Sequence, residues 1–108
     1  AWSKGSLALL QTICAVAQQE AVLEPLLAEW QRSQPDLQKK FAQLPGSAGK
    51  SWRWEGEMHE VAQLFEASGL PGGFHRAAAE VFGRLEGFKD QPDISLAQVV
   101  QRLNVGRD

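Results

Sequence analysis

The chain has 108 residues, of which 44% are hydrophobic and 22% charged, and its formal net charge is -2. This length fits one domain with a core of its own, and the charge balance excludes the clustered Lys and Arg of a nucleic-acid-binding surface. The longest apolar run, Leu7 to Ala17, is interrupted by Gln11 and Thr12 and is shorter than the roughly 20 residues that cross a bilayer, so we expect no membrane span.

The single cysteine, Cys14, lies inside this apolar run. One cysteine cannot form an internal disulfide, and a thiol among apolar neighbours usually behaves as a small buried hydrophobe. No signal peptide is recognisable in the sequence. These features are typical of a protein of the reducing cytoplasm.

Apolar residues recur at spacings of three and four along the whole chain, so the sequence predicts an all-α fold. The first predicted helix, residues 2–19, is apolar nearly all round between Leu7 and Ala17. Such a pattern is typical of a helix buried on several sides. We expect residues 1–108 to form a single bundle of about six helices around this buried first helix.

The second and third predicted helices begin at prolines, which fit a first helical turn because no amide hydrogen is needed there. One begins near Pro25 and turns its leucines and Trp30 inward, and the other begins at Pro35. The apolar stripe of this third helix consists of Leu37, Phe41 and Leu44. The run Pro45 to Gly49 predicts the clearest break in the chain.

The fourth predicted helix contains two tryptophans, Trp52 and Trp54, which must face different surfaces at about 100° per residue. Trp54 falls on the inward stripe, and Trp52 falls over Gly56. A helical glycine costs roughly 1 kcal/mol relative to alanine, so its presence indicates close packing by Trp52, by another backbone or by a ligand. The rest of the inward stripe consists of Met58, Val61 and Phe65.

This helix is predicted to end at Ser68-Gly69, where glycine can adopt the left-handed cap conformation. A fifth helix follows, with Phe74, Ala78, Val81 and Leu85 on one side and a run of three alanines that allows a neighbouring helix to approach. Ser95 and Gln98 predict a capping box at the start of a sixth helix. The apolar edge of this last helix consists of Leu96, Val99, Val100 and Leu103.

Several apparent catalytic motifs fail on spacing. Gly49-Lys50-Ser51 lacks the earlier glycine and the strand of a phosphate-binding loop, and His59-Glu60 lacks the second histidine of a zinc-protease helix. The Gly69 to Gly73 turn is not a dinucleotide-binding fingerprint. His75 has no evident partner to orient it, so we expect a partly exposed surface residue rather than a catalytic base.

Several segments resemble a helical domain of uncharacterised function that follows the nucleotide-binding domain in 6-phosphogluconate dehydrogenase-like and β-hydroxyacid dehydrogenase-like proteins. The likeness runs from Ala1 to about Leu103. The segments that carry it are Ala1 to Leu10, Glu29-Trp30, Ser33-Gln34-Pro35, Trp52-Arg53-Trp54 with Glu57-Met58 and Glu60, Gly69-Leu70-Pro71, Phe74-His75, and Ala77 to Val81.

The resemblance implies a C-terminal domain attached to an upstream Rossmann domain that binds NAD or NADP, with hydride transfer in the cleft between the two domains. It also implies that the catalytic lysine lies upstream of Ala1, about two helical turns before Lys4. We therefore expect no catalytic residue in this chain, and an inactive domain when it is isolated. Relatives bury the first helix between subunits, so a two-fold homodimer is expected.

Three residues are candidates for binding a small anionic substrate: Lys4, Arg53 and Glu57. The wider β-hydroxyacid dehydrogenases carry a Lys-Asp pair near the nicotinamide, where this chain has Glu57 and Met58. The resemblance therefore does not imply that this chain shares their substrate. A guanidinium at Arg53 could clamp a carboxylate or phosphate. The alternatives are an Arg53 to Glu57 pair within the helix and a solvated Lys4.

The sequence thus predicts the substrate-binding and dimerisation domain of an NAD(P)-dependent oxidoreductase that acts on a small hydroxy acid or sugar acid. The rival hypothesis is a non-enzymatic helical module for protein-protein interaction, with the Trp-Arg-Trp row as its hot spot, because Trp and Arg are enriched at such centres.

Overall fold

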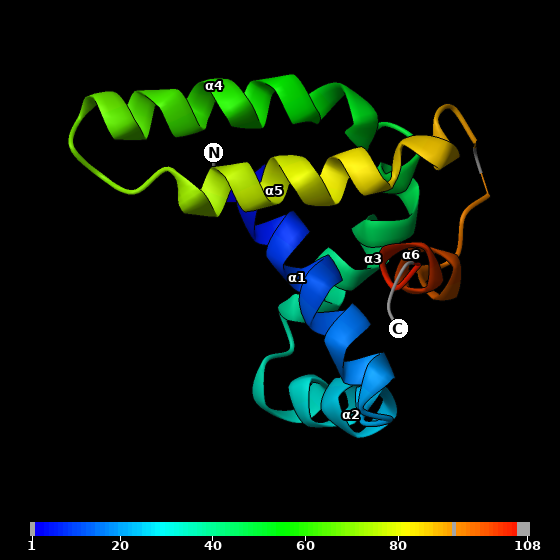
Figure 1. The fold of residues 1–108 in the computed structure, drawn as a ribbon. Helices are drawn as coiled ribbons and strands as arrows, with labels where there is room; N and C mark the ends of the chain where they lie inside the picture. Colours follow the sequence, from blue (N-terminus) through cyan, green and yellow to red (C-terminus); the bar gives the residue numbers. More distant parts are fainter. Residues whose placement is uncertain (1, 92, 106–108) are drawn as a thin grey trace.

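The computed structural model describes residues 2–91 and 93–105, and these residues form α-helices, short 3-10 helices and loops without any strand (Figure 1). The prediction of an all-α fold is confirmed. Five helices have at least 11 residues and α6 has eight. The elements are α1 (Trp2–Gln19), α2 (Leu23–Ser33), α3 (Leu37–Ala48), η1 (Ser51–Arg53), α4 (Trp54–Ala67), α5 (Gly73–Arg84), η2 (Glu86–Phe88) and α6 (Leu96–Leu103).

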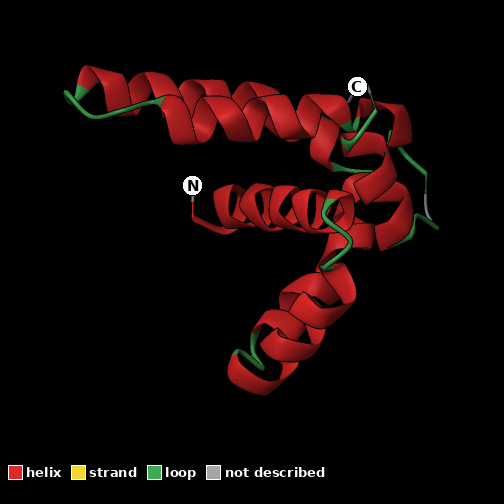
Figure 2. Ribbon diagram, turned by 60° about the horizontal axis from the view of Figure 1, so that its bottom comes forward, coloured by secondary structure: helices red, strands yellow, loops and turns green. Residues whose placement is uncertain are grey.

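The helices α4 and α5 form an antiparallel hairpin that projects from the rest of the domain (Figures 1 and 2). The predicted glycine cap is confirmed, because Gly69 has a φ of 79°. A Cβ on Gly72 would lie 2.9 Å from the carbonyl oxygen of Ala62, so only glycine allows the returning chain to approach α4 this closely. The Arg76 guanidinium donates to both carboxylate oxygens of Glu66 and lowers the pKa of that carboxyl group.

The first helix, α1, packs against α2, α3, α5 and α6, but part of its surface stays uncovered. The prediction that it is buried on several sides is confirmed where these four helices lie and is wrong for the remaining face. On that face Leu9 is 61% exposed and Val16 is 57% exposed. The physical reason is that α2 leans away from the helix and the α4–α5 hairpin covers one side of its N-terminal half (Figure 2). None of the described helices is long and apolar enough to cross a membrane.

The main core lies where α1, α4, α5 and α6 meet. The predicted inward face of α4 is confirmed, since Met58 is fully buried and Trp54 packs against this core. The Trp54 and Phe82 rings meet edge to face, with their centroids 5.4 Å apart. The largest fully buried apolar side chains of this core are Phe82, Met58, Leu85, Val99 and Cys14.

A smaller apolar cluster joins α1 and α3, with Trp30 of α2 packed against it. The predicted break over Pro45 to Gly49 is confirmed only at its end, because α3 continues through Pro45 and ends at Ala48. Leu44 and Ala48 lie one turn apart, and both are fully buried, so their packing holds the last turn of the helix in place despite the proline. Phe41, which we expected in the stripe of this helix, has a side chain outside the described ones.

The last helix, α6, begins with the predicted capping box. The Ser95 hydroxyl accepts a hydrogen bond from the Gln98 amide, and the Gln98 side chain accepts one from the Ser95 amide. Two donors at the start of the helix are thus satisfied. Val99, Val100 and Leu103 are buried, as the spacing predicts.

Gln11 is the least expected member of the interior. Its side chain on α1 is fully buried, and neither amide atom has a hydrogen-bond partner among the described residues. Burying an amide without hydrogen bonds costs about 1–3 kcal/mol in proteins. We therefore expect Gln11→Met, which keeps the length of the side chain, to raise the free energy of unfolding by roughly 1–2 kcal/mol in a urea titration. A loss of stability would show that the amide has a hydrogen-bonding role.

Cys14 behaves as the small hydrophobe that we predicted. It is fully buried, and burial raises the pKa of its thiol from 9.0 to about 11. The folded state therefore disfavours the thiolate, so this group contributes stability below pH 9 that is lost as the pH rises toward 11. At pH 8, iodoacetamide should modify Cys14 in the folded protein far more slowly than in urea, and equal rates would contradict this burial.

Candidate functional site

The N-terminal turns of α1 meet the first turns of α4, and there the structure brings two of the predicted candidates together. The ammonium group of Lys4 lies 2.6 Å from a carboxylate oxygen of Glu57, 53 positions along the chain. The same nitrogen lies 5.1 Å from the centre of the Trp54 ring, within the range of a cation–π contact. Lys4 is therefore paired, and its expected alternative as a freely solvated lysine is wrong.

Arg53 closes η1 and directly precedes α4. Its side chain is exposed and makes no hydrogen bond or ion pair with any residue in the described part of the chain. The proposed Arg53 to Glu57 pair is not formed, because the Glu57 carboxylate is bound to Lys4 from the other helix. Of the three candidates, Arg53 is thus the cation left available to an anionic ligand.

Trp52 does not lie over Gly56 as the helical spacing predicted. Because Trp52 belongs to the 3-10 helix η1 rather than to α4, the regular angle of 100° per residue does not apply across this point. Its ring faces Lys89, whose ammonium nitrogen lies 4.2 Å from the ring centre. Gly56 is exposed, and a Cβ added to it would lie more than 4 Å from every described atom outside its own helix backbone. Close packing therefore does not explain this glycine.

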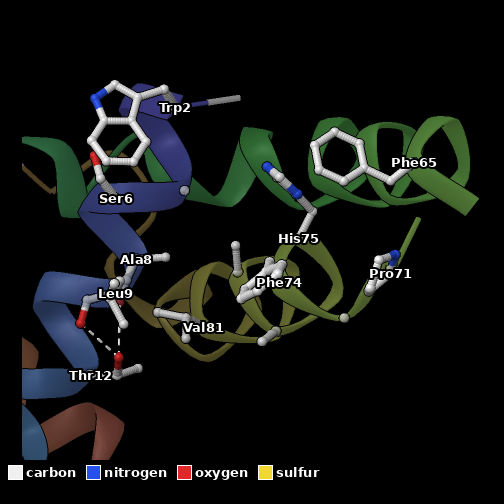
Figure 3. A pocket seen from close by; sticks show the side chains of 14 residues that line it. Trp2, Ser6, Ala8, Leu9, Thr12, Phe65, Pro71, Phe74, His75 and Val81 are labelled. Atoms are coloured by element: carbon white, nitrogen blue, oxygen red, sulfur yellow. Dashed lines mark hydrogen bonds between the residues drawn. The ribbon is translucent and has the colours of Figure 1, made fainter. Parts of the chain in front are cut away.

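A groove of about 750 Å³ lies between the first half of α1 and the hairpin of α4 and α5 (Figure 3). Its lining is almost wholly apolar and includes small residues from both helices, among them Gly5, Ala8 and Ala78. The large side chains at its edges are exposed: Trp2 is 79% exposed and Phe74 is 77% exposed. The alanine run of α5 predicted the close helix contact, but nothing in the sequence identified the groove.

His75 lines this groove and corrects the prediction of a surface residue, because only 8% of it is exposed. Its imidazole extends from α5 between Phe65 and the N-terminal turns of α1 (Figure 3). The centres of the His75 and Phe65 rings lie 4.7 Å apart, and the rings meet edge to face. No described residue forms a hydrogen bond with the ring, and Nδ1 is sealed from solvent. The signal for this burial is Gly5, which leaves room for the imidazole, but only a three-dimensional view pairs the two residues.

The described residues contain no group of three His, Cys, Asp or Glu side chains that could bind a metal ion. His59 and Glu60, which open an incomplete zinc-protease motif, are both exposed on α4.

Comparison with known proteins gives one match. Residues 17–85 fit the model of a family described as a domain of unknown function, DUF1932. No curated protein and no solved structure matches the chain.

Proposed function

The chain belongs to the DUF1932 family, and on this premise we propose that it is the C-terminal substrate-binding and dimerisation domain of an NAD(P)-dependent oxidoreductase. The substrate class is a small anionic hydroxy acid or sugar acid. The resemblance of its sequence segments to the helical domain of 6-phosphogluconate dehydrogenase-like proteins suggests this reaction class.

The observation that carries the proposal is the arrangement of Lys4, Glu57 and Arg53 at the start of α4. Lys4 and Glu57, distant in sequence, meet beside Trp54, and the unpaired Arg53 immediately precedes this tryptophan. A guanidinium without a carboxylate partner can bind a carboxylate or phosphate through two parallel hydrogen bonds. In this arrangement Arg53 binds the anionic group of the substrate, while the Lys4–Glu57 pair fixes α4 against α1.

The nicotinamide cofactor does not fit this chain alone. Dinucleotide-binding domains hold the pyrophosphate at a glycine-rich turn between a strand and a helix, and the described residues contain no strand. In the proposal, a Rossmann domain elsewhere in the full-length protein binds NAD or NADP and supplies the catalytic lysine. The role of this chain is to bind and orient the substrate.

The uncovered face of α1 supports the dimerisation part of the proposal. Val16, which lies on this face outside the groove, is apolar and 57% exposed. Covering such an apolar face with a second subunit lowers the free energy, and most soluble homo-oligomers are two-fold dimers. Sedimentation of the full-length protein at micromolar concentration should give a dimer that Val16→Glu dissociates. A monomeric wild-type protein would contradict this prediction.

The direct test is turnover by the full-length protein. We expect reduction of NAD or NADP with at least one member of a panel of 2-hydroxy acids, 3-hydroxy acids and sugar acids, followed by the absorbance of the reduced nicotinamide. Failure of both cofactors to bind, measured by calorimetry, would overturn the oxidoreductase proposal.

The exposed aromatic edges of the groove favour a second candidate function, a helical module for protein-protein interaction. This candidate predicts no nicotinamide binding by the full-length protein. The same calorimetric measurement therefore separates the two functions.

A further inference from the structure

We propose that the groove between α1 and α5 binds a small organic molecule with a flat aromatic body and a hydroxyl group, which donates a hydrogen bond to His75. This site goes beyond the oxidoreductase proposal, because the anion-binding candidates lie elsewhere. Lys4 and Gly5 are consecutive on α1, yet Lys4 reaches Glu57 of α4 whereas Gly5 faces His75 of α5.

The size and the lining of the groove suit a flat ring. Its volume of about 750 Å³ falls within the roughly 300–1,000 Å³ of small-molecule sites. Gly5, Ala8 and Ala78 line it with little bulk, while the rings of Trp2 and Phe74 stand exposed at its edges. A planar apolar molecule could lie on these small residues and cover part of both exposed rings, which is favourable in proportion to the apolar area removed from water.

The polar requirement comes from His75. A neutral imidazole has one acceptor nitrogen and one N–H donor, and none of the described residues hydrogen-bonds to this ring. The Nε2 atom lies 3.6 Å from where a Cβ on Gly5 would be, and Gly5 is itself a lining residue, so this nitrogen is on the side of the ring that faces α1. A ligand hydroxyl that donates to Nε2 would supply the hydrogen bond that no described residue makes to this ring.

The other polar side chains of the lining already have hydrogen-bond partners. The hydroxyl of Ser6 donates to the carbonyl oxygen of Ser3, and that of Thr12 donates to the carbonyl oxygen of Leu9 at 2.8 Å. Both donors are thus used within α1. His75 is therefore the polar side chain of the groove that has no hydrogen-bond partner among the described residues.

A matched pair of probes, 2-naphthol and naphthalene, tests the proposal on the 108-residue chain. We expect 2-naphthol to bind about tenfold more tightly than naphthalene, as one net hydrogen bond in an apolar site would give. The backbone amide signals of Gly5, Ala8, Ala77 and Ala78 should shift in nuclear magnetic resonance titrations. His75→Phe should lower the affinity for 2-naphthol about tenfold and leave that for naphthalene unchanged.

Ala77→Trp provides a second variant that does not disturb the buried histidine. Ala77 lines the groove but is exposed, so a tryptophan there fills the groove from outside, and binding of both probes should be lost. Leu64→Ala, at an exposed residue of α4 outside the groove, is the matched control and should bind both probes normally.

Three results would overturn the proposal: unchanged binding in Ala77→Trp, equal affinity of the wild type for both probes, or groove signals that broaden with protein concentration alone. The last result would assign the groove to a second copy of the chain. Because binding is measured without turnover, failure here leaves the oxidoreductase proposal untouched, and failure of that proposal leaves this binding test valid.

Discussion

Phe82→Ala is expected to lower the free energy of unfolding by about 3–5 kcal/mol, the usual cost of removing a buried phenylalanine. The side chain is fully buried in the main core, and its ring meets Trp54 edge to face across the α4–α5 hairpin. Alanine would leave a cavity at the point where the hairpin joins the rest of the domain. Because small domains are stable by only about 5–15 kcal/mol, urea titration should show a large loss of stability.

The matched control is Phe74→Ala on the same helix. Phe74 is 77% exposed, so its removal should change the free energy of unfolding by less than about 1 kcal/mol. If Phe82→Ala does not fold, Phe82→Leu keeps most of the volume and should cost about 1–1.5 kcal/mol. Equal effects of Phe82→Ala and Phe74→Ala would contradict the placement of the core.

Much of this fold is predictable because its determinants are local. Helix positions follow from apolar spacing, and the cap at Gly69 and the capping box at Ser95 follow from the conformations and hydrogen bonds of a few consecutive residues. Pro45 shows where a local rule fails. A local rule predicts a break at Pro45, but the burial of Leu44 and Ala48 is a tertiary effect that overrides it.

The errors concern which neighbour covers which face. The apolar pattern of α1 shows that many sides could be buried, but whether Leu9 and Val16 are covered depends on where α2 and the hairpin lie. The burial of His75 likewise depends on the approach of Gly5 from α1. Hydrophobic periodicity contains no information on these contacts between distant segments.

The candidate site was predictable as a set of residues but not as an arrangement. Charge and the family resemblance point to Lys4, Arg53 and Glu57, and the spacing of one turn allows an Arg53 to Glu57 pair. The structure pairs Glu57 with Lys4 instead. This exchange leaves Arg53 unpaired among the described residues, and it is the reason that Arg53 becomes the strongest of the three candidates.

Arg53→Ala in the full-length protein is expected to reduce kcat/KM by roughly ten- to a hundredfold, which corresponds to the loss of a charged hydrogen bond of about 1.5–3 kcal/mol. Stability should hardly change, because the side chain is exposed and has no partner among the described residues. Steady-state kinetics with the best hydroxy acid or sugar acid of the panel would measure the first effect, and thermal melts the second.

Two further variants separate recognition of the substrate from charge alone. Arg53→Lys keeps the positive charge but loses the planar fork, so it should recover only part of the activity if Arg53 binds the anion through two hydrogen bonds. Arg32→Ala is the matched control, because Arg32 is an exposed arginine paired with Glu29 on α2, and its kcat/KM should equal that of the wild type. Wild-type kcat/KM in Arg53→Ala would remove Arg53 from the site, whereas an equal loss in Arg32→Ala would mean that net charge, rather than a bound anion, governs the rate.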